Sequence, residues 1–257
     1  MRRAAWLTVL WLSSAWAAEP SACRTDGVLI FPQPGSVVPT NVQWILEGVG
    51  SQQTNVADLV GNDVVTLVPS GKDTTPITLK VEKGWVSQMK RVAVRLRSPR
   101  PLSPETTYTL HFGKPLASAT LLGDPLGNGT IRWTTASGPD RDLPRYREKP
   151  AVTEGNYAKS EKDGAVQRQL TLRTNVDESG PAYLLISMQR LRGSSVKQQY
   201  PVPITGATTV IGHDACSGTF GFEDGRAYKL TFELVDSAGN RNAEKPTLEV
   251  SAPRPAR

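Results

Sequence analysis

The sequence predicts an all-β protein built from two tandem antiparallel sandwich domains behind a cleaved signal peptide. Apolar and polar residues alternate in many short runs, turn residues separate these runs, and no window of about 11 residues after the signal shows helical periodicity. Hydrophobic residues make up 38% and charged residues 21% of the 257 positions, which excludes a multi-span membrane protein and a disordered polyelectrolyte. We therefore expect a chain that folds around buried cores.

Residues 1–17 have the pattern of a secretory signal peptide. Arg2 and Arg3 give a positive start, an apolar core follows, and residues 15–17 read Ala-Trp-Ala, the small-residue pattern of a cleavage site. We expect cleavage after Ala17, which places the mature protein in the periplasm or outside the cell. A retained anchor needs about 18 consecutive apolar residues, and polar residues interrupt this run. No later stretch approaches that length, so we expect no transmembrane segment in the mature chain.

Period-2 alternation identifies the strands, because successive side chains of a strand point to opposite faces of its sheet. In the first half of the chain it predicts strands over residues 77–82, 92–97 and 107–112. In the second half it predicts strands over residues 169–176, 184–188 and 228–234. Many short strands with turns between them are typical of antiparallel sandwiches.

A polar, proline-containing stretch at residues 138–149 divides the chain, and we interpret it as a linker. The two predicted domains, residues 24–137 and 150–252, each have the length of one immunoglobulin-like sandwich of about 100 residues. Residues 253–257 are rich in proline and arginine, and we expect a disordered tail there.

Two segments of the first half carry a family resemblance. Residues 31–41 read Phe-Pro-Gln-Pro-Gly-Ser-Val-Val-Pro-Thr-Asn, and residues 101–110 read Pro-Leu-Ser-Pro-Glu-Thr-Thr-Tyr-Thr-Leu. Both resemble bacterial immunoglobulin-like modules of the surface-layer-protein (SbsA-like) type. Residues 236–240, Asp-Ser-Ala-Gly-Asn, are similar to the end of bacterial immunoglobulin-like or fibronectin-like repeats. The resemblance implies a spacer, an adhesive unit or an appendage of the cell envelope, and it brings no catalytic residues.

Cys23 and Cys216 are the two cysteines, and an oxidising compartment favours a disulfide between them. Loop closure by this bond would contribute roughly 3–5 kcal/mol to the free energy of unfolding. The bond requires the two domains to fold back on each other, because bridged cysteines need close Cα atoms. Lipidation of Cys23, two free thiols and an intermolecular bridge stay open as alternatives. The spacing of cysteines and histidines fits no metal motif, so we expect no metal and no cofactor.

Two short motifs could indicate a catalytic site or a calcium site, and we favour neither interpretation. His213 and Cys216 could form a thiol catalytic site, but no oxyanion-forming residues accompany them, so we interpret His213 as a loop histidine beside a cystine. Residues 236–240 carry oxygen ligands that suit calcium, but they lack the regular acidic spacing of a calcium loop. A tight turn capped by Asp236 is the preferred interpretation.

The strongest charge feature is a basic stripe. Arg91, Arg95 and Arg97 share one face of a predicted strand and could bind a polyanion. The alternative, which we favour, is a solvated sheet face, because no exposed aromatic residues are interleaved for stacking on bases. The formal charge of +6 also includes Arg2 and Arg3, which leave with the signal peptide. We therefore expect no nucleic-acid partner.

Together these features predict a non-enzymatic secreted or periplasmic protein of the cell envelope. Its role would be that of a structural or binding module, with an envelope protein or a glycan as the partner. One alternative is an accessory or catalytic carbohydrate-active protein, since two carboxylates can suffice for glycoside cleavage. The other alternative is a lipid-tethered outer-membrane component.

Overall fold

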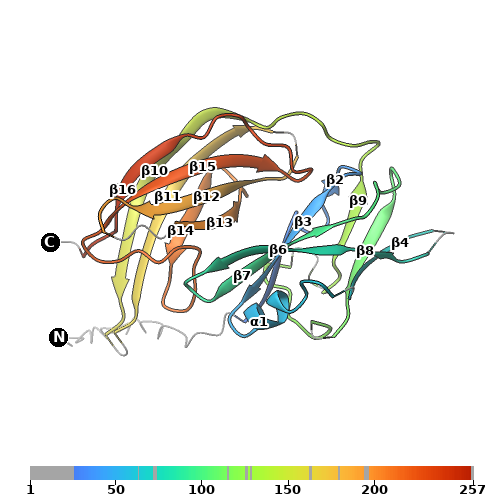
Figure 1. Ribbon diagram of the computed structural model, residues 1–257, viewed down its shortest axis with the longest axis horizontal. Coiled ribbons are helices and arrows are strands. Elements are labelled where there is room, and N and C mark those ends of the chain that lie inside the picture. Colours follow the sequence, from blue (N-terminus) through green and yellow to red (C-terminus); the bar gives the residue numbers. More distant parts are fainter. Residues whose placement is uncertain are drawn as a thin grey trace, which may run out of the picture.

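The computed structural model is all-β apart from one short helix, α1 (Gln52–Ala57) (Figure 1). It describes residues 26–62, 64–71, 74–114, 116–124, 127, 129–161, 164–178, 180–193 and 197–255. The predicted signal peptide and Cys23 lie outside these residues. No helix within the described ranges has the length and apolar character needed to cross a membrane.

The first sandwich has the strand order of an immunoglobulin fold. Its two sheets are ordered β1-β3-β7-β6 and β2-β9-β8-β4-β5, which correspond to strands A-B-E-D and A′-G-F-C-C′. Strand β2 joins the second sheet by pairing in parallel with β9. The strands are β1 (Gly27–Phe31), β2 (Val37–Val38), β3 (Gln43–Val49), β4 (Val65–Pro69), β5 (Ile77–Thr78), β6 (Lys80–Ser87), β7 (Arg91–Arg97), β8 (Thr107–Phe112) and β9 (Arg132–Thr135).

The second sandwich follows the same scheme without a D strand. Its sheets are ordered β10-β11-β14 and β13-β12-β15-β16, and all of these pairs are antiparallel. The strands are β10 (Arg145–Lys159), β11 (Val166–Asp177), β12 (Ala182–Arg190), β13 (Gln198–Pro203), β14 (Thr208–His213), β15 (Ala227–Asp236) and β16 (Thr247–Ser251). The predicted all-β class with two immunoglobulin-like sandwiches is therefore the observed one.

Each sandwich contains a core of large side chains. In the first, the rings of Trp44 and Trp133 lie 5.5 Å apart, and Trp133 Nε1 donates to the carbonyl oxygen of Pro32 at 3.0 Å. In the second, Leu230 and Phe232 are fully buried on one face of β15. The indole N–H of Trp133 thus keeps a hydrogen bond inside an apolar core, as a buried polar group requires.

Both sandwiches contain a tyrosine corner at the start of their F strand. The Tyr108 hydroxyl accepts from the backbone N–H of Ser103 at 3.0 Å, and the Tyr228 hydroxyl accepts from that of Glu223 at 2.9 Å. Tyr108 and Tyr228 are 2% and 1% exposed. Each hydroxyl therefore fixes the loop that leads into its strand, in the way known for immunoglobulin-like sandwiches.

The outer face of one sheet of the first sandwich packs against the side of the second sandwich (Figure 1). Ile45 and Ala93, on the outer face of the β1-β3-β7-β6 sheet, are buried in the hydrophobic cluster of the second sandwich. Phe31 packs edge-on against Tyr183, with 5.5 Å between ring centroids. We call this contact surface, which also includes Tyr200, the seam.

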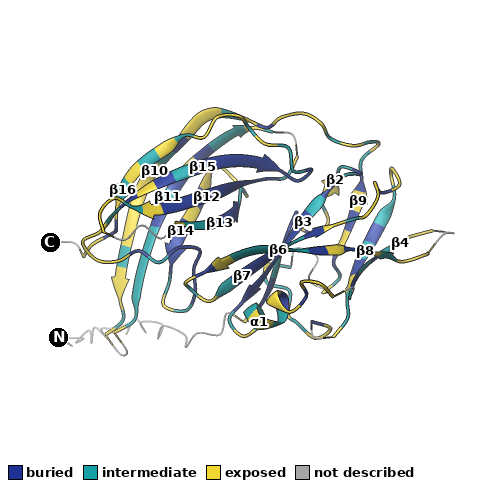
Figure 2. Ribbon diagram, in the orientation of Figure 1, coloured by how far each residue is buried: buried dark blue, intermediate teal, exposed yellow. Residues whose placement is uncertain are grey.

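The seam explains burial that alternation does not predict. Strand β3 is buried without interruption from Trp44 to Val49. Trp44 and Leu46 face the first core, whereas Ile45 and Glu47 face the seam. Strand β12 is likewise buried from Ala182 to Met188. Figure 2 shows β12 and β15 as buried strands, in contrast to the largely exposed β10.

The linker and the tail differ from the predicted boundaries. Strand β10 begins at Arg145, inside the linker predicted over residues 138–149. It is an exposed edge strand, so its charged composition hid the strand pattern. At the other end, Pro253 is buried, and its carbonyl oxygen accepts from Arg168 Nε at 3.2 Å. The tail predicted to be disordered from residue 253 is therefore docked at its first residue.

We expect Tyr108→Phe to lower the free energy of unfolding by about 0.5–1.5 kcal/mol, because the substitution removes the acceptor of the partly buried hydrogen bond from the backbone N–H of Ser103. Urea denaturation followed by tryptophan fluorescence measures this change. Tyr157→Phe, at a partly exposed position of β10, is the control and should change stability by less than about 0.5 kcal/mol. Equal effects of the two substitutions would contradict a tyrosine corner at Tyr108.

Candidate functional site at the seam

A buried carboxylate lies at the centre of the seam. Glu47 extends from the outer face of β3 and is 8% exposed. Its Oε1 atom accepts from Arg91 Nη1 at 3.2 Å and from the Tyr200 hydroxyl at 2.9 Å. Arg91 also lies 3.4 Å from Ser217 Oγ through Nε and through Nη2. Four side chains from both sandwiches thus share one polar cluster inside an apolar contact.

Burial dominates the electrostatics of this cluster. It raises the pKa of Glu47 above its ordinary value, although Arg91 and the hydrogen bond from Tyr200 act in the opposite direction. Burial and the neighbouring Glu47 carboxylate also raise the pKa of Tyr200, so its hydroxyl stays protonated and donates. A buried ion pair of this kind adds little net stability, but removal of one partner leaves an uncompensated charge.

A tight turn holds one end of the seam. Asp214 Oδ1 accepts from the backbone N–H groups of Cys216 and Ser217 at 2.7 and 2.8 Å. Gly218 then donates to the carbonyl oxygen of Met89 at 3.0 Å and accepts from Ser87 Oγ at 2.7 Å. A Cβ atom at residue 218 would collide with the backbone of β14, so this docking needs glycine.

The structure locates His213 and Cys216 but not Cys23, the predicted partner of Cys216. His213 is buried, and its Nδ1 lies 3.1 Å from the carbonyl oxygen of Asp214. Cys216 is in the docked turn, next to the seam, whereas Cys23 is outside the described residues. The disulfide between them therefore stays a prediction.

A second turn and the linker hold the other end. Asp236 accepts from the backbone N–H of Asn240 through Oδ1 and from its side-chain amide through Oδ2, both at 2.8 Å. Gln43 donates from its backbone to Ser237 and from its side chain to Ala238, at 2.7 and 2.9 Å. Within the described residues, no group of three His, Cys, Asp or Glu side chains forms a metal site. Asp236 thus acts as the cap of a docked turn.

The linker itself is hydrogen-bonded to both sandwiches. The carbonyl oxygen of Asp140 accepts from the Asn41 amide at 2.8 Å and from the Asn240 amide at 3.3 Å. The backbone N–H of Asp140 donates back to Asn41 Oδ1 at 2.9 Å. Together with the two turns, this contact fixes the relative position of the sandwiches.

Carboxylates pair with the cations of the basic stripe, and its role in polyanion binding stays a prediction. Arg91, Arg95 and Arg97 do share one face of β7, and their exposure rises along it, from a 21% exposed side chain at Arg91 in the seam to 51% at Arg97. Arg91 pairs with Glu47, and both Arg95 and Arg97 pair with Glu82, at 3.7 and 3.3 Å. The Arg95 guanidinium also lies over the ring of Trp85. Each of the three cations therefore has a carboxylate partner, and Arg95 and Arg97 share Glu82.

An apolar groove of about 460 Å³ opens on one side of the seam. It lies between β1, β13 and β14, and the Glu47–Arg91 pair forms the charged part of its lining. Val210 of β14 is 52% exposed at its rim. The remaining lining residues include Ile30, Phe31, Ile45, Leu121, Pro201, Val202 and Pro203.

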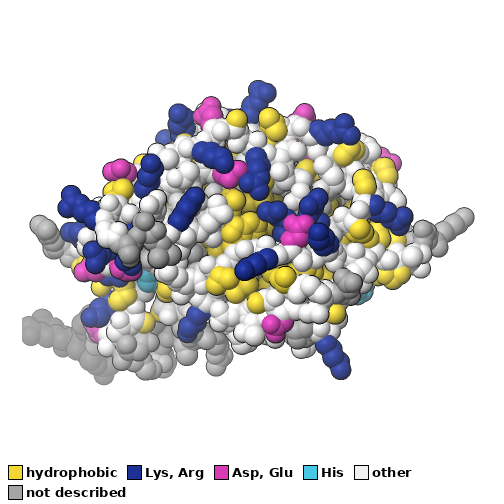
Figure 3. Space-filling view, in the orientation of Figure 1, with side chains coloured by type: hydrophobic (Ala, Val, Ile, Leu, Met, Phe, Trp, Pro, Cys, Tyr) yellow, Lys and Arg dark blue, Asp and Glu magenta, His cyan; other side chains and the backbone are white. Residues whose placement is uncertain are grey.

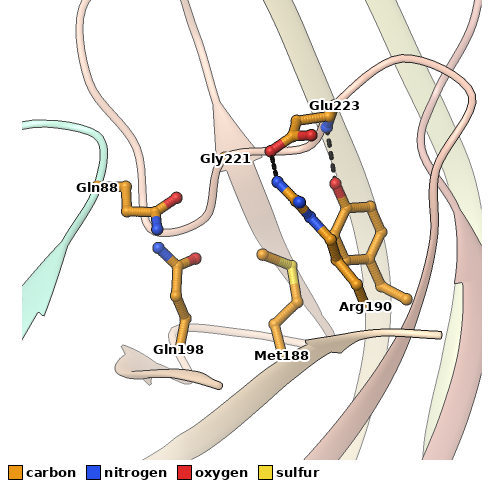
Figure 4. A pocket seen from close by; sticks show the side chains of 7 residues that line it. Gln88, Met188, Arg190, Gln198, Gly221 and Glu223 are labelled. Carbon is orange, nitrogen blue, oxygen red and sulfur yellow. Dashed lines mark hydrogen bonds and ion pairs between the residues drawn. The ribbon is translucent and has the colours of Figure 1, made fainter. Parts of the chain in front are cut away.

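A smaller, polar pocket of about 200 Å³ lies between the β6–β7 turn and the second sandwich. Figure 4 shows the side-chain amides of Gln88 and Gln198, one from each sandwich, pointing toward one another. The amide atoms of Gln198 are buried and have no hydrogen-bond partner within the described residues. Rotation of one amide by half a turn would bring its oxygen opposite the NH₂ group of the other side chain, where the two could form a hydrogen bond. Arg190 and Glu223 form an ion pair at the far wall.

Hydrophobic side chains also reach the surface near the seam. Figure 3 shows them gathered in the middle of one face, with lysine and arginine side chains around them. A hollow of about 270 Å³ is lined by Val60, Trp85 and Val86, and Val86 is 67% exposed. Apolar surface of this kind is common where a protein meets a partner.

Of the residues that form the site, the sequence analysis singled out Arg91, in another role, and missed Glu47, Tyr200 and Gln198. Glu47 offered one signal, because it is a single carboxylate after the apolar run Trp-Ile-Leu, and such a residue is buried if the strand is covered on both faces. Tyr200 offered none, since its partner Glu47 lies in the other half of the chain, and Gln198 offered none, since the Gln88 side chain that it faces also lies there.

Comparison with known proteins yields no assignment by sequence, since no family model and no curated protein matches the chain. Solved structures that align with it include the pullulanase of Bacillus subtilis 168 complexed with maltose, at 8% identity and a TM-score of 0.26. The FN1–FN3 domains of chicken CNTN1 align at 13% identity and a TM-score of 0.28, over 87% of this chain and 65% of that chain. The alignment with the pullulanase covers 86% of this chain and 24% of the pullulanase chain. The immunoglobulin-like topology follows from the sheet orders themselves.

We expect Arg91→Met to lower the free energy of unfolding at pH 7 by about 3 kcal/mol, because Glu47 is then buried without its cation. The loss should shrink as the pH falls through the raised pKa of Glu47, since the protonated carboxyl needs no cation. Urea denaturation at several pH values measures both effects. Arg97→Met is the control: its side chain is 51% exposed, and we expect a change below about 1 kcal/mol with little pH dependence. A loss that grows toward acid pH would contradict this account of Glu47.

Proposed function

We propose that this chain is a non-enzymatic, exported protein of the cell envelope that binds a partner through the seam between its sandwiches. The observation that carries the proposal is the apolar groove of about 460 Å³ between β1, β13 and β14. Ligand sites are typically concave, mostly apolar and pre-formed, and they favour the boundaries between domains. The two docked turns and the Asp140 contact support a pre-formed groove, because they hold its walls together from both ends.

The proposed compartment rests on the sequence of residues 1–17, and cleavage after Ala17 would release the protein to the periplasm or the cell surface. We also propose that the first sandwich is of the surface-layer (SbsA-like) type, on the strength of residues 31–41 and 101–110. The second of these segments contains Ser103 and Tyr108, the two residues of the first tyrosine corner. An envelope role agrees with that type of module.

We further propose the Cys23–Cys216 disulfide. The turn that carries Cys216 docks on the β6–β7 turn of the first sandwich, so the second sandwich is folded back as the bond requires. Such a bond would join the start of the first sandwich to the turn of the second sandwich that Asp214 caps.

We expect Val210→Asp to reduce retention of labelled envelope fractions about tenfold in a pull-down, because a charge at the rim would have to be desolvated against apolar walls. Val37→Asp is the matched control, since Val37 is 62% exposed on β2 and is not part of the groove lining. Equal retention by the two variants would exclude the groove as the binding site. Release of reducing sugars from envelope polysaccharide would instead favour the carbohydrate-active alternative.

We expect the intact mass of the mature protein to match a chain that begins at Ala18 and lacks two hydrogens. Reduction should lower the free energy of unfolding by roughly 3–5 kcal/mol, because the unfolded chain regains the entropy of an open loop. Mass spectrometry with and without reductant, followed by urea denaturation, measures both quantities. An acyl group on Cys23 would contradict the disulfide and support a lipid-tethered outer-membrane component.

A further inference from the structure

The free edge of β14 opens into the apolar groove. The backbone of Gly212 points away from β11, since its N–H donates to Thr219 Oγ1 at 3.2 Å and its carbonyl oxygen accepts from Thr219 N at 2.8 Å. Backbone groups of an antiparallel strand point to the same side at every second residue. The N–H and C=O groups of Val210 and Thr208 therefore also point away from β11. Within the described residues, no other backbone segment pairs with them.

The chain already uses this kind of pairing at the other wall of the groove. Val28 of β1 donates to the carbonyl oxygen of Thr120 at 2.9 Å and accepts from the N–H of Leu122 at 2.8 Å, in a parallel bridge centred on Leu121. Leu121 and Leu122 also line the groove. A single bridge residue, Leu121, thus occupies the edge of β1, and the groove begins beside it.

The third wall cannot accept a strand in the same way. Strand β13 turns Pro201 and Pro203 toward its outer side, because neither residue has an N–H that could pair with β12. The outer edge of β13 thus lacks donors at these positions. Donors and acceptors in alternation are found at β14 instead, next to the apolar side chains of Val202 and Ile45.

The charges of the groove restrict the occupant. Glu47 and Arg91 are the charged residues of its lining, and they already pair with each other. A charged side chain entering the groove would find no free counter-charge among the described lining residues, so the walls favour an uncharged segment.

From these edges and walls we infer that the groove binds an extended, uncharged segment of a partner protein by adding it as a strand to β14. This mode takes affinity from backbone hydrogen bonds and specificity from pockets for alternate side chains. The stretch from Thr208 to Val210 spans about 10 Å at about 3.3 Å per residue, enough for a short strand. The inference rests on the proposed function, because it names the partner class for the same groove.

The test uses a labelled peptide, acetyl-Thr-Val-Thr-Val-Thr-amide, and a copy with N-methyl groups on alternate amides. Fluorescence anisotropy should detect binding of the first peptide, with amide hydrogen-exchange protection at Val210. Val210→Pro removes the N–H that faces the groove and no bond to β11, so it should weaken binding about tenfold, as loss of one or two hydrogen bonds predicts. Val210→Thr keeps the N–H and a β-branched side chain, and its affinity should stay within about twofold.

The comparison of the two peptides tests strand addition even if Val210→Pro fails to fold. Equal binding of the two peptides, or no binding at about millimolar peptide, the weakest affinity expected for a single small site, would overturn the inference. A dimer of the unmodified protein that Val210→Pro dissociates would also overturn it, because a second copy would then be the occupant. Loss of envelope retention in Val210→Asp together with normal retention in Val210→Pro would refute strand addition and leave the proposed function intact.

Discussion

The outer face of the β1-β3-β7-β6 sheet has to be covered, and the remaining architecture depends on this constraint. Ile45 and Ala93 give that face an apolar centre, and the second sandwich buries both side chains to 5% exposure or less. At about 25 cal/mol per Å² of apolar area removed from water, burial of this kind is the main favourable contribution to the contact. Glu47 lies on the same face, so the apolar contact can form only if the carboxylate finds partners. Arg91 and Tyr200 supply them from the two sides of the seam.

Rigidity of the seam and the presence of a groove are two consequences of the same packing. The outer face of the first sandwich covers the open flank of the second, between the edge strands β13 and β14, and the groove is the part of that flank that stays unfilled. Because the docked turns fix the walls at both ends, a ligand would not need to order them on binding. Pre-organised walls reduce the entropic cost of association. The polar pocket is a second cavity of the contact, and side chains of both sandwiches, among them Gln88 and Gln198, line it.

The sequence predicted the strands with clear alternation, such as β7, but it predicted neither β10 nor the seam. Alternation identified the core face of β7 correctly, since Val94 and Leu96 are buried in the first core. It also assigned Ala93 and Arg91 to a solvated face, because a pattern of period 2 shows which residues share a face and not what covers that face. The partners of Glu47 could not be predicted either, as Tyr200 lies 153 residues away. Glycine at residue 218 reads as a turn residue, and its real constraint, contact with β14, appears only in three dimensions.

Differences among the strand edges argue for a role of β14. Proteins usually protect an exposed edge with proline, charge or a bulge, since a bare edge invites unwanted pairing. Strand β13 has Pro201 and Pro203, and β10 combines many charged residues with several register shifts. Strand β14 has none of these features between Thr208 and Gly212, and Val210 stands exposed beside its free backbone groups. An uncovered edge of this kind is a site for aggregation. A partner strand that pairs with β14 would cover the edge, which explains why β14 lacks the protection that β10 and β13 have.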